Sequence, residues 1–129
     1  MIYITGDTHR DFRRLYNNEF KEGDTIIILG DAGINYFLDD RDITLKDNLN
    51  KLNVKLFCIR GNHEERPEYI DSYEEIEMFS GKVMIEKDYP NLIFAKDGEI
   101  YNIDGKSVLV IGGAYSVDKD YRIMYGYRW

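Results

Sequence analysis

The sequence predicts an α/β protein with a sheet that is parallel in its first half. Short apolar runs alternate with longer amphipathic segments there, which is the pattern of βαβ units. The run at 25–29 is continuously apolar, as expected of a strand that is covered on both faces. Because the chain has 129 residues, of which 43% are hydrophobic, we expect a single domain over residues 1–129.

The first half is expected to hold three strands and two helices. Phe12, Leu15 and Phe20 recur at helical spacing, which predicts the first helix. Ile43 and Leu49 belong to an apolar stripe among charged residues, which predicts the second. We expect strands at 1–6, 25–29 and 54–59, and helices at 11–20 and within 40–52.

The second half changes to a pattern of short strands. Asp104-Gly105-Lys106 is a plausible hairpin turn between the last two of them. The segment 67–79 is expected to be helical or irregular, and the glutamates between 64 and 77 are expected to form a solvated face. We expect the short strands at 83–85, 92–94, 99–103 and 107–111.

Composition excludes several classes of protein. The net charge of −7 offers no general attraction to nucleic acid or anionic lipid, so a phosphate ligand would need local positive charge. No apolar run approaches the roughly 18 residues of a membrane span, and no secretion signal is recognisable, so we expect a cytoplasmic protein without membrane contact. The single Cys58 excludes an internal disulfide. Walker A, GxGxxG and CxxC motifs are absent from the sequence.

Polar clusters follow each of the three strands expected in the first half. They are Gly6-Asp7-Thr8-His9, Gly30-Asp31-Ala32-Gly33 and Gly61-Asn62-His63-Glu64. Because ligands bind at the carboxyl ends of neighbouring parallel strands, the three clusters should converge. Their mixed oxygen and nitrogen donors suit Mn, Fe, Zn or Mg. If the strand before Asp31 lies between the other two, this carboxylate can bridge two ions.

These three motifs resemble those of the calcineurin-like metallophosphoesterases. The segment 112–118 resembles a later segment of the small bacterial and phage members, and the likeness runs from Met1 to about Arg122. The resemblance implies a four-layer α/β/β/α sandwich that hydrolyses phosphate mono- or diesters with a metal-activated water. Alternatives with an acid after the first strand fit poorly, because haloacid dehalogenase-type phosphatases need Asp-x-Asp and response-regulator receivers lack the Asn-His-Glu cluster.

The resemblance also implies a role for each motif residue. Asp7 and His9 would bind the first of two divalent ions, Asp31 would bridge, and Asn62 would bind the second. His63 would act as the general acid toward the leaving group or as a donor to the phosphate. Arg10 and Arg60 lie beside the motifs and are candidates for holding the substrate phosphate.

The sequence departs from the family in its histidines. Family members add a lone histidine and a Gly-His-x-His motif from a second sheet, whereas only His9 and His63 occur here. We therefore expect a weak second metal site and an incomplete second sheet. Apolar faces after Lys82 and the aromatic tail 115–129 should then be exposed, and a second copy or a complementing chain would cover them. The alternative function is a weakly active or inactive relative, which serves as a binding or regulatory module or as one part of a split phosphoesterase.

Overall fold

The computed structural model describes residues 1–113 and 116–127 and confirms a mixed α/β fold. A six-stranded sheet has the order β1-β2-β3-β6-β5-β4. Strands β1, β2, β3 and β6 are parallel, whereas β5 and β4 run antiparallel to their neighbours. The strands are β1 (Ile2–Gly6), β2 (Thr25–Leu29), β3 (Lys55–Ile59), β4 (Tyr73–Met78), β5 (Gly81–Glu86) and β6 (Tyr89–Ala95).

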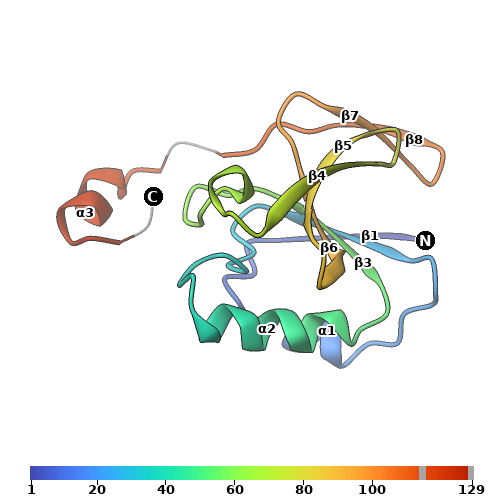
Figure 1. Cartoon of the computed structure of the whole chain (residues 1–129), viewed down its shortest axis with the longest axis horizontal. Coiled ribbons are helices and arrows are strands. Elements are labelled where there is room, and N and C mark those ends of the chain that lie inside the picture. Colours follow the sequence, from blue (N-terminus) through green and yellow to red (C-terminus); the bar gives the residue numbers. More distant parts are fainter. Residues whose placement is uncertain (114–115, 128–129) are drawn as a thin grey trace.

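Helices cover one face of this sheet and a β-hairpin covers part of the other (Figure 1). The helical face includes α1 (Arg13–Tyr16) and α2 (Asp40–Asn50), which pack on a core with Ile28 and Leu56 at its centre. The hairpin consists of β7 (Ile100–Ile103) and β8 (Lys106–Leu109). Within the described residues the second sheet is this hairpin, so the four-layer arrangement stays a prediction.

Two expected elements differ in the structure. The first helix is a single turn, because Asn17 and Asn18 follow it and asparagine competes for backbone hydrogen bonds in helices. The segment 67–79 contains a short 3₁₀ turn, η1 (Pro67–Tyr69), and the edge strand β4. The alternation of acidic and apolar residues at 75–78 has the period of a strand, and the glutamates concealed that pattern.

Tyr101 joins the hairpin to the main sheet. Its ring is fully buried and meets the Phe57 ring edge to face, with a centroid distance of 5.0 Å. Its hydroxyl donates to the carbonyl of Lys82 and accepts a hydrogen bond of 2.8 Å from the backbone N–H of Lys96. The hairpin is therefore attached to β5 and to the end of β6 by polar as well as apolar contacts.

Part of the sheet lies outside the cover of the hairpin. Ile4 and Leu29 are 66% and 53% exposed, and Leu109 and Ile111 are 59% and 77% exposed. The pairing register places Ile4 beside Ile27, which belongs to the core beneath the hairpin, so the apolar face of the sheet continues outward at β1. Leu109 and Ile111 follow Lys82, where the sequence predicted exposed apolar surface, whereas the exposure of Ile4 and Leu29 was not predicted. Leu109 pairs with Ile100 on the side of the hairpin that faces away from the main sheet. The four residues are together called here the open apolar face.

The last described segment forms α3 (Lys119–Met124), which lies apart from the sheet (Figure 1). Tyr121, Tyr125 and Tyr127 are more than half exposed, so the described part of the aromatic tail is not buried by this chain itself. Tyr115 and Trp129 lie outside the described residues. The longest helix, α2, has eleven residues, and none of the described helices could cross a bilayer.

Candidate metal centre

The loops that follow β1, β2 and β3 meet at one edge of the sheet, as predicted. Gly6 pairs with Leu29 and Leu29 with Ile59, so the three strands end level with one another. Beyond them the backbone N–H of Asp7 donates to the carbonyl of Gly30 at 3.1 Å. The backbone N–H of His9 likewise donates to the carbonyl of Asp31 at 2.9 Å. The first two motifs are therefore tied together along their backbones.

Three of the motif residues adopt the left-handed backbone conformation. The φ angles are 55° at Asp7, 44° at His9 and 45° at Asp31, and Arg10 follows with 70°. This region is uncommon for residues other than glycine, although Asp, Asn and His are enriched in it. Such strain costs of the order of 1–3 kcal/mol per residue and clusters at functional sites, where the surrounding structure enforces it.

Asp31 is the centre of the cluster. Strand β2 lies between β1 and β3, which is the position that the bridging role requires. The Asp31 Oδ2 atom lies 3.3 Å from His63 Nδ1 and 3.9 Å from His9 Nε2. Its Oδ1 atom accepts a hydrogen bond of 3.0 Å from the backbone N–H of His63. One ligand atom from each of His9, Asp31 and His63 lies within 4.8 Å of the others.

The donor set fits a divalent transition metal. Ligand atoms about 2.0–2.2 Å from an ion lie about 3–4 Å from one another, which matches the two Asp31–histidine distances. Asp7 extends the set, because its Oδ1 atom lies 2.7 Å from His9 Nε2 and its side chain is 73% exposed. Asn62 is half-buried in the loop after β3, immediately before His63, and its role as a ligand stays a prediction.

Gly61 gives Asp31 the room it occupies. A Cβ atom at position 61 would lie 1.8 Å from Asp31 Oδ1 and 2.2 Å from the Asp31 backbone nitrogen. No side chain can be accommodated at such distances without moving the loop. The glycine before Asn62 is therefore required by the close approach of the β2 and β3 loops.

A comparison with known families decides between the classes that such a cluster could serve. The family model described as calcineurin-like phosphoesterase matches residues 1–128. The chain belongs to this family. No curated protein and no solved structure matches it. Members of the family typically bind divalent metals and hydrolyse phosphate esters, so His9, Asp31 and His63 form a candidate metal-binding group.

Glu64 holds two loops of this phosphoesterase-family chain together. Its carboxylate accepts hydrogen bonds of 3.1 Å from the backbone N–H groups of Gly33 and Gly61. The residue is 5% exposed, and burial raises its pKa to about 7. The expectation that the glutamates between 64 and 77 form a solvated face is therefore wrong for Glu64. Its carboxylate is buried because the backbone N–H groups of Gly33 and Gly61 donate hydrogen bonds to it, and the sequence of charges does not show such donors.

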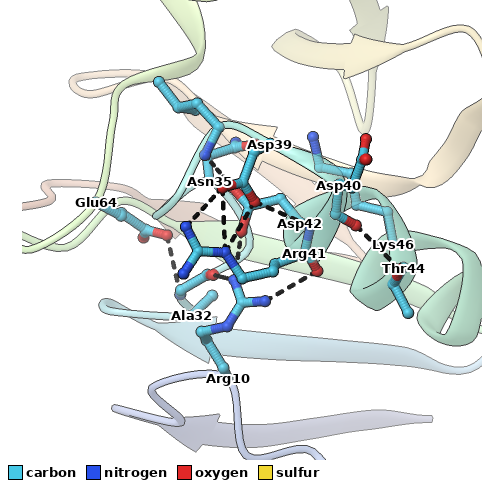
Figure 2. Close-up of polar contacts among 12 residues, drawn as sticks. Arg10, Ala32, Asn35, Asp39, Asp40, Arg41, Asp42, Thr44, Lys46 and Glu64 are labelled. Atoms are coloured by element: carbon cyan, nitrogen blue, oxygen red, sulfur yellow. Dashed lines mark hydrogen bonds and ion pairs between the residues drawn. The ribbon is translucent and has the colours of Figure 1, made fainter.

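The two candidate phosphate arginines take part in ion pairs that shape the site. Arg10 Nη1 pairs with the buried Asp42 and donates to the carbonyl of Gly33 at 2.8 Å, so it links the β1 loop to the start of α2 (Figure 2). Arg60 Nε donates to Asp97 Oδ2 at 2.6 Å, and a Cβ on Gly112 would lie 2.8 Å from the Arg60 side chain. These contacts anchor loops, and the binding of phosphate by either arginine stays a prediction.

A cavity of about 200 Å³ opens beside the cluster. Arg122 on α3 lines it, and Asp118 at the start of α3 places its Oδ1 atom 3.5 Å from His63 Nε2. Sequence reasoning did not assign either residue to the site, although Asp118 belongs to the segment 112–118 that resembles the family and the likeness runs to about Arg122. A hydrogen bond from Ser116, and to a smaller extent one from Arg122, lowers the pKa of Asp118 to about 2. The cavity is lined by His9, Arg10, Asp31, Gly33, Tyr36, Phe37, His63 and Arg122.

Proposed function

We propose that this chain hydrolyses phosphate mono- or diesters with the help of divalent metal ions held at the ends of β1, β2 and β3. The observation that carries the proposal is the convergence of His9, Asp31 and His63, whose ligand atoms lie within 4.8 Å of one another although they come from three separate loops. Membership of the phosphoesterase family supports the same reaction class.

Each motif residue has a proposed role. Asp7 and His9 would hold the first ion, Asp31 would bridge, and Asn62 would hold the second. When bound, divalent ions neutralise phosphate charge and lower the pKa of a water molecule toward about 7. His63 would donate a proton to the leaving-group oxygen. The His63 side chain is 14% exposed. The hydrogen bond from its backbone N–H to Asp31 holds the His63 backbone next to the cluster.

A titration with Mn²⁺, followed by assays on p-nitrophenyl phosphate and its bis-ester, tests the proposal. Saturable Mn²⁺ binding with metal-dependent release of nitrophenol is the expected result. Absence of both metal binding and turnover would contradict it. The variant His63→Ala separates two roles for the imidazole. If His63 is a proton donor, the variant turns over more slowly and its affinity for Mn²⁺ is unchanged. If His63 is a metal ligand, the affinity for Mn²⁺ falls as well.

A second candidate function is a binding or regulatory module, or one part of a split enzyme. The observation favouring it is the small ligand set, since His9 and His63 are the only histidines of the sequence. Two side chains, Asp31 and Asn62, hold a second transition metal weakly against water. Stoichiometric Mn²⁺ binding at one site without turnover of either ester is the result that would favour this candidate.

The open apolar face supports a further part of the proposal, which is that a second copy or a complementing chain covers it. An exposed apolar surface of this kind marks an interaction site in soluble proteins. The cytoplasmic location expected from the sequence stays a prediction.

A further inference from the structure

We propose that Arg122, presented by α3, binds the phosphoryl group of the substrate beside the metal cluster. This role rests on the proposed function and deepens it, because it names the residue of this chain that would recognise the anionic part of the ester. The carrying observation is that the Arg122 side chain lines the same cavity as His9, Asp31 and His63.

The cavity suits a phosphoryl group better than a large ligand. Pockets for drug-sized molecules measure about 300–1,000 Å³. The cavity here is about 200 Å³, and it combines a cationic side chain with the proposed proton donor His63. A phosphate bound there would contact Arg122 and the metal cluster at once, while the rest of its ester would extend toward solvent.

Arg122 is held in place before any ligand arrives. Its Nε atom donates to Asp118 Oδ2 at 2.8 Å, and its side chain is 21% exposed. The Ser116 hydroxyl donates to the other oxygen of the same carboxylate, so Asp118 is itself oriented. Arg122 also hydrogen-bonds with Tyr36, another residue that lines the cavity. A guanidinium carries five N–H donors in a fixed fork, so it can hold several acceptors at once. An arginine oriented in this way loses little side-chain entropy when it binds an oxyanion.

The charges around the cavity single out Arg122 from the other lining cation. Arg10 also lines the cavity, but it forms an ion pair with Asp42, which is 2% exposed, and donates to two backbone carbonyls. Its charge is therefore largely balanced within the protein. Arg122 has partners too, in Asp118 and Tyr36, but its ion pair is more accessible to a ligand, because the Asp118 side chain is 40% exposed and that of Asp42 is 3% exposed. In a chain with a net charge of −7, an anionic substrate needs such a local cation.

The test measures the binding of inorganic phosphate to the full chain by isothermal titration calorimetry, with and without Mn²⁺. Arg122→Gln should weaken phosphate binding at least tenfold, and Arg122→Lys should weaken it less, because lysine keeps the charge but loses the planar fork. Lys106→Gln removes the same charge from the hairpin and should stay within twofold of the wild type. The affinity for Mn²⁺ should stay within twofold in all three variants.

Steady-state assays supply the second readout. In Arg122→Gln the KM for p-nitrophenyl phosphate should rise at least tenfold, whereas in Lys106→Gln it should not change. Asp118→Asn keeps the arginine and removes its clamp, so phosphate binding should weaken about threefold. If Arg122→Gln does not fold, as judged by circular dichroism, unchanged phosphate affinity in Asp118→Asn overturns the proposal.

The other outcomes separate this inference from the proposed function. Unchanged phosphate affinity in Arg122→Gln, or no phosphate binding by the wild type, overturns the role of Arg122. A loss of Mn²⁺ affinity in that variant overturns it as well, since the arginine would then support the metal rather than the substrate. Phosphate binding that depends on Arg122, in a chain that hydrolyses neither ester, supports this inference and contradicts the proposed function.

Discussion

At the scale of single residues, the site depends on a carboxylate and a glycine that approach closely. Asp31 is 9% exposed and reaches both histidines of the chain. It can do so because Gly61 carries no side chain where the Asp31 carboxylate lies. The position of the Asp31 carboxylate in the cluster therefore depends on the absence of a side chain at Gly61.

Asp31→Asn is expected to abolish most of the metal affinity. The amide keeps the shape of the side chain but removes the negative charge shared by both proposed ions, so the affinity for Mn²⁺ should fall about a hundredfold or more. Calorimetric titration with Mn²⁺ measures the change. Asp104→Asn, in the turn between β7 and β8, is the matched control and should bind Mn²⁺ as the wild type does. Equal affinity in the two variants would contradict the central place of Asp31.

Gly61→Ala is expected to destabilise the fold strongly. The added Cβ would lie 1.8 Å from Asp31 Oδ1, so the β2 and β3 loops must separate, and we expect a loss of at least about 3 kcal/mol in the free energy of unfolding. Gly105→Ala is the control, because a Cβ there meets nothing within 4 Å and only the positive φ is strained. That strain costs about 1–2 kcal/mol. Urea denaturation measures the free energy of unfolding of both variants, and a larger loss in Gly61→Ala shows that the steric overlap with Asp31 costs more than backbone strain alone.

At the scale of elements, one buried hydroxyl makes two of the hydrogen bonds that attach the hairpin β7–β8 to the main sheet. Tyr101→Phe keeps the ring against Phe57 but leaves the Lys96 N–H and the Lys82 carbonyl without their partner. We expect a loss of about 1–3 kcal/mol in the free energy of unfolding. Tyr69→Phe, at a position that is 71% exposed, should change it little. Metal affinity should be the same in both variants, because the hairpin does not contribute to the cluster.

Some elements and site residues were predictable from the sequence, and others were not. The strand ends and the polar residues that follow them were predictable, because a polar motif directly after an apolar run is a local signal, as at Asp7 and Asp31. Strand β4 was missed because its three glutamates masked the strand period. Arg122 and Asp118 were missed because their approach to His63 depends on where α3 lies, and no local pattern encodes that position. Whether Asn62 binds a metal stays a prediction.

At the scale of the whole molecule, the open apolar face predicts self-association. Sedimentation experiments at increasing concentration should show dimers or larger species, and a dye that binds apolar surface should fluoresce with the chain. Leu109→Lys should shift the equilibrium toward the monomer, since it places a charge in the face. Ile43→Lys, on an exposed position of α2, is the control and should leave the equilibrium unchanged. A monodisperse monomer that binds no dye would contradict this prediction.

The order of the strands also decides where the sheet could grow. Its two outer strands are β4, in which three of the six residues are glutamates, and β1, in which the five residues Ile2–Gly6 carry no charge. A row of like charges discourages a further strand from pairing with an exposed edge, whereas an uncharged edge offers its backbone groups without that penalty. A strand from another molecule would therefore add beside β1, next to the loop that carries Asp7 and His9.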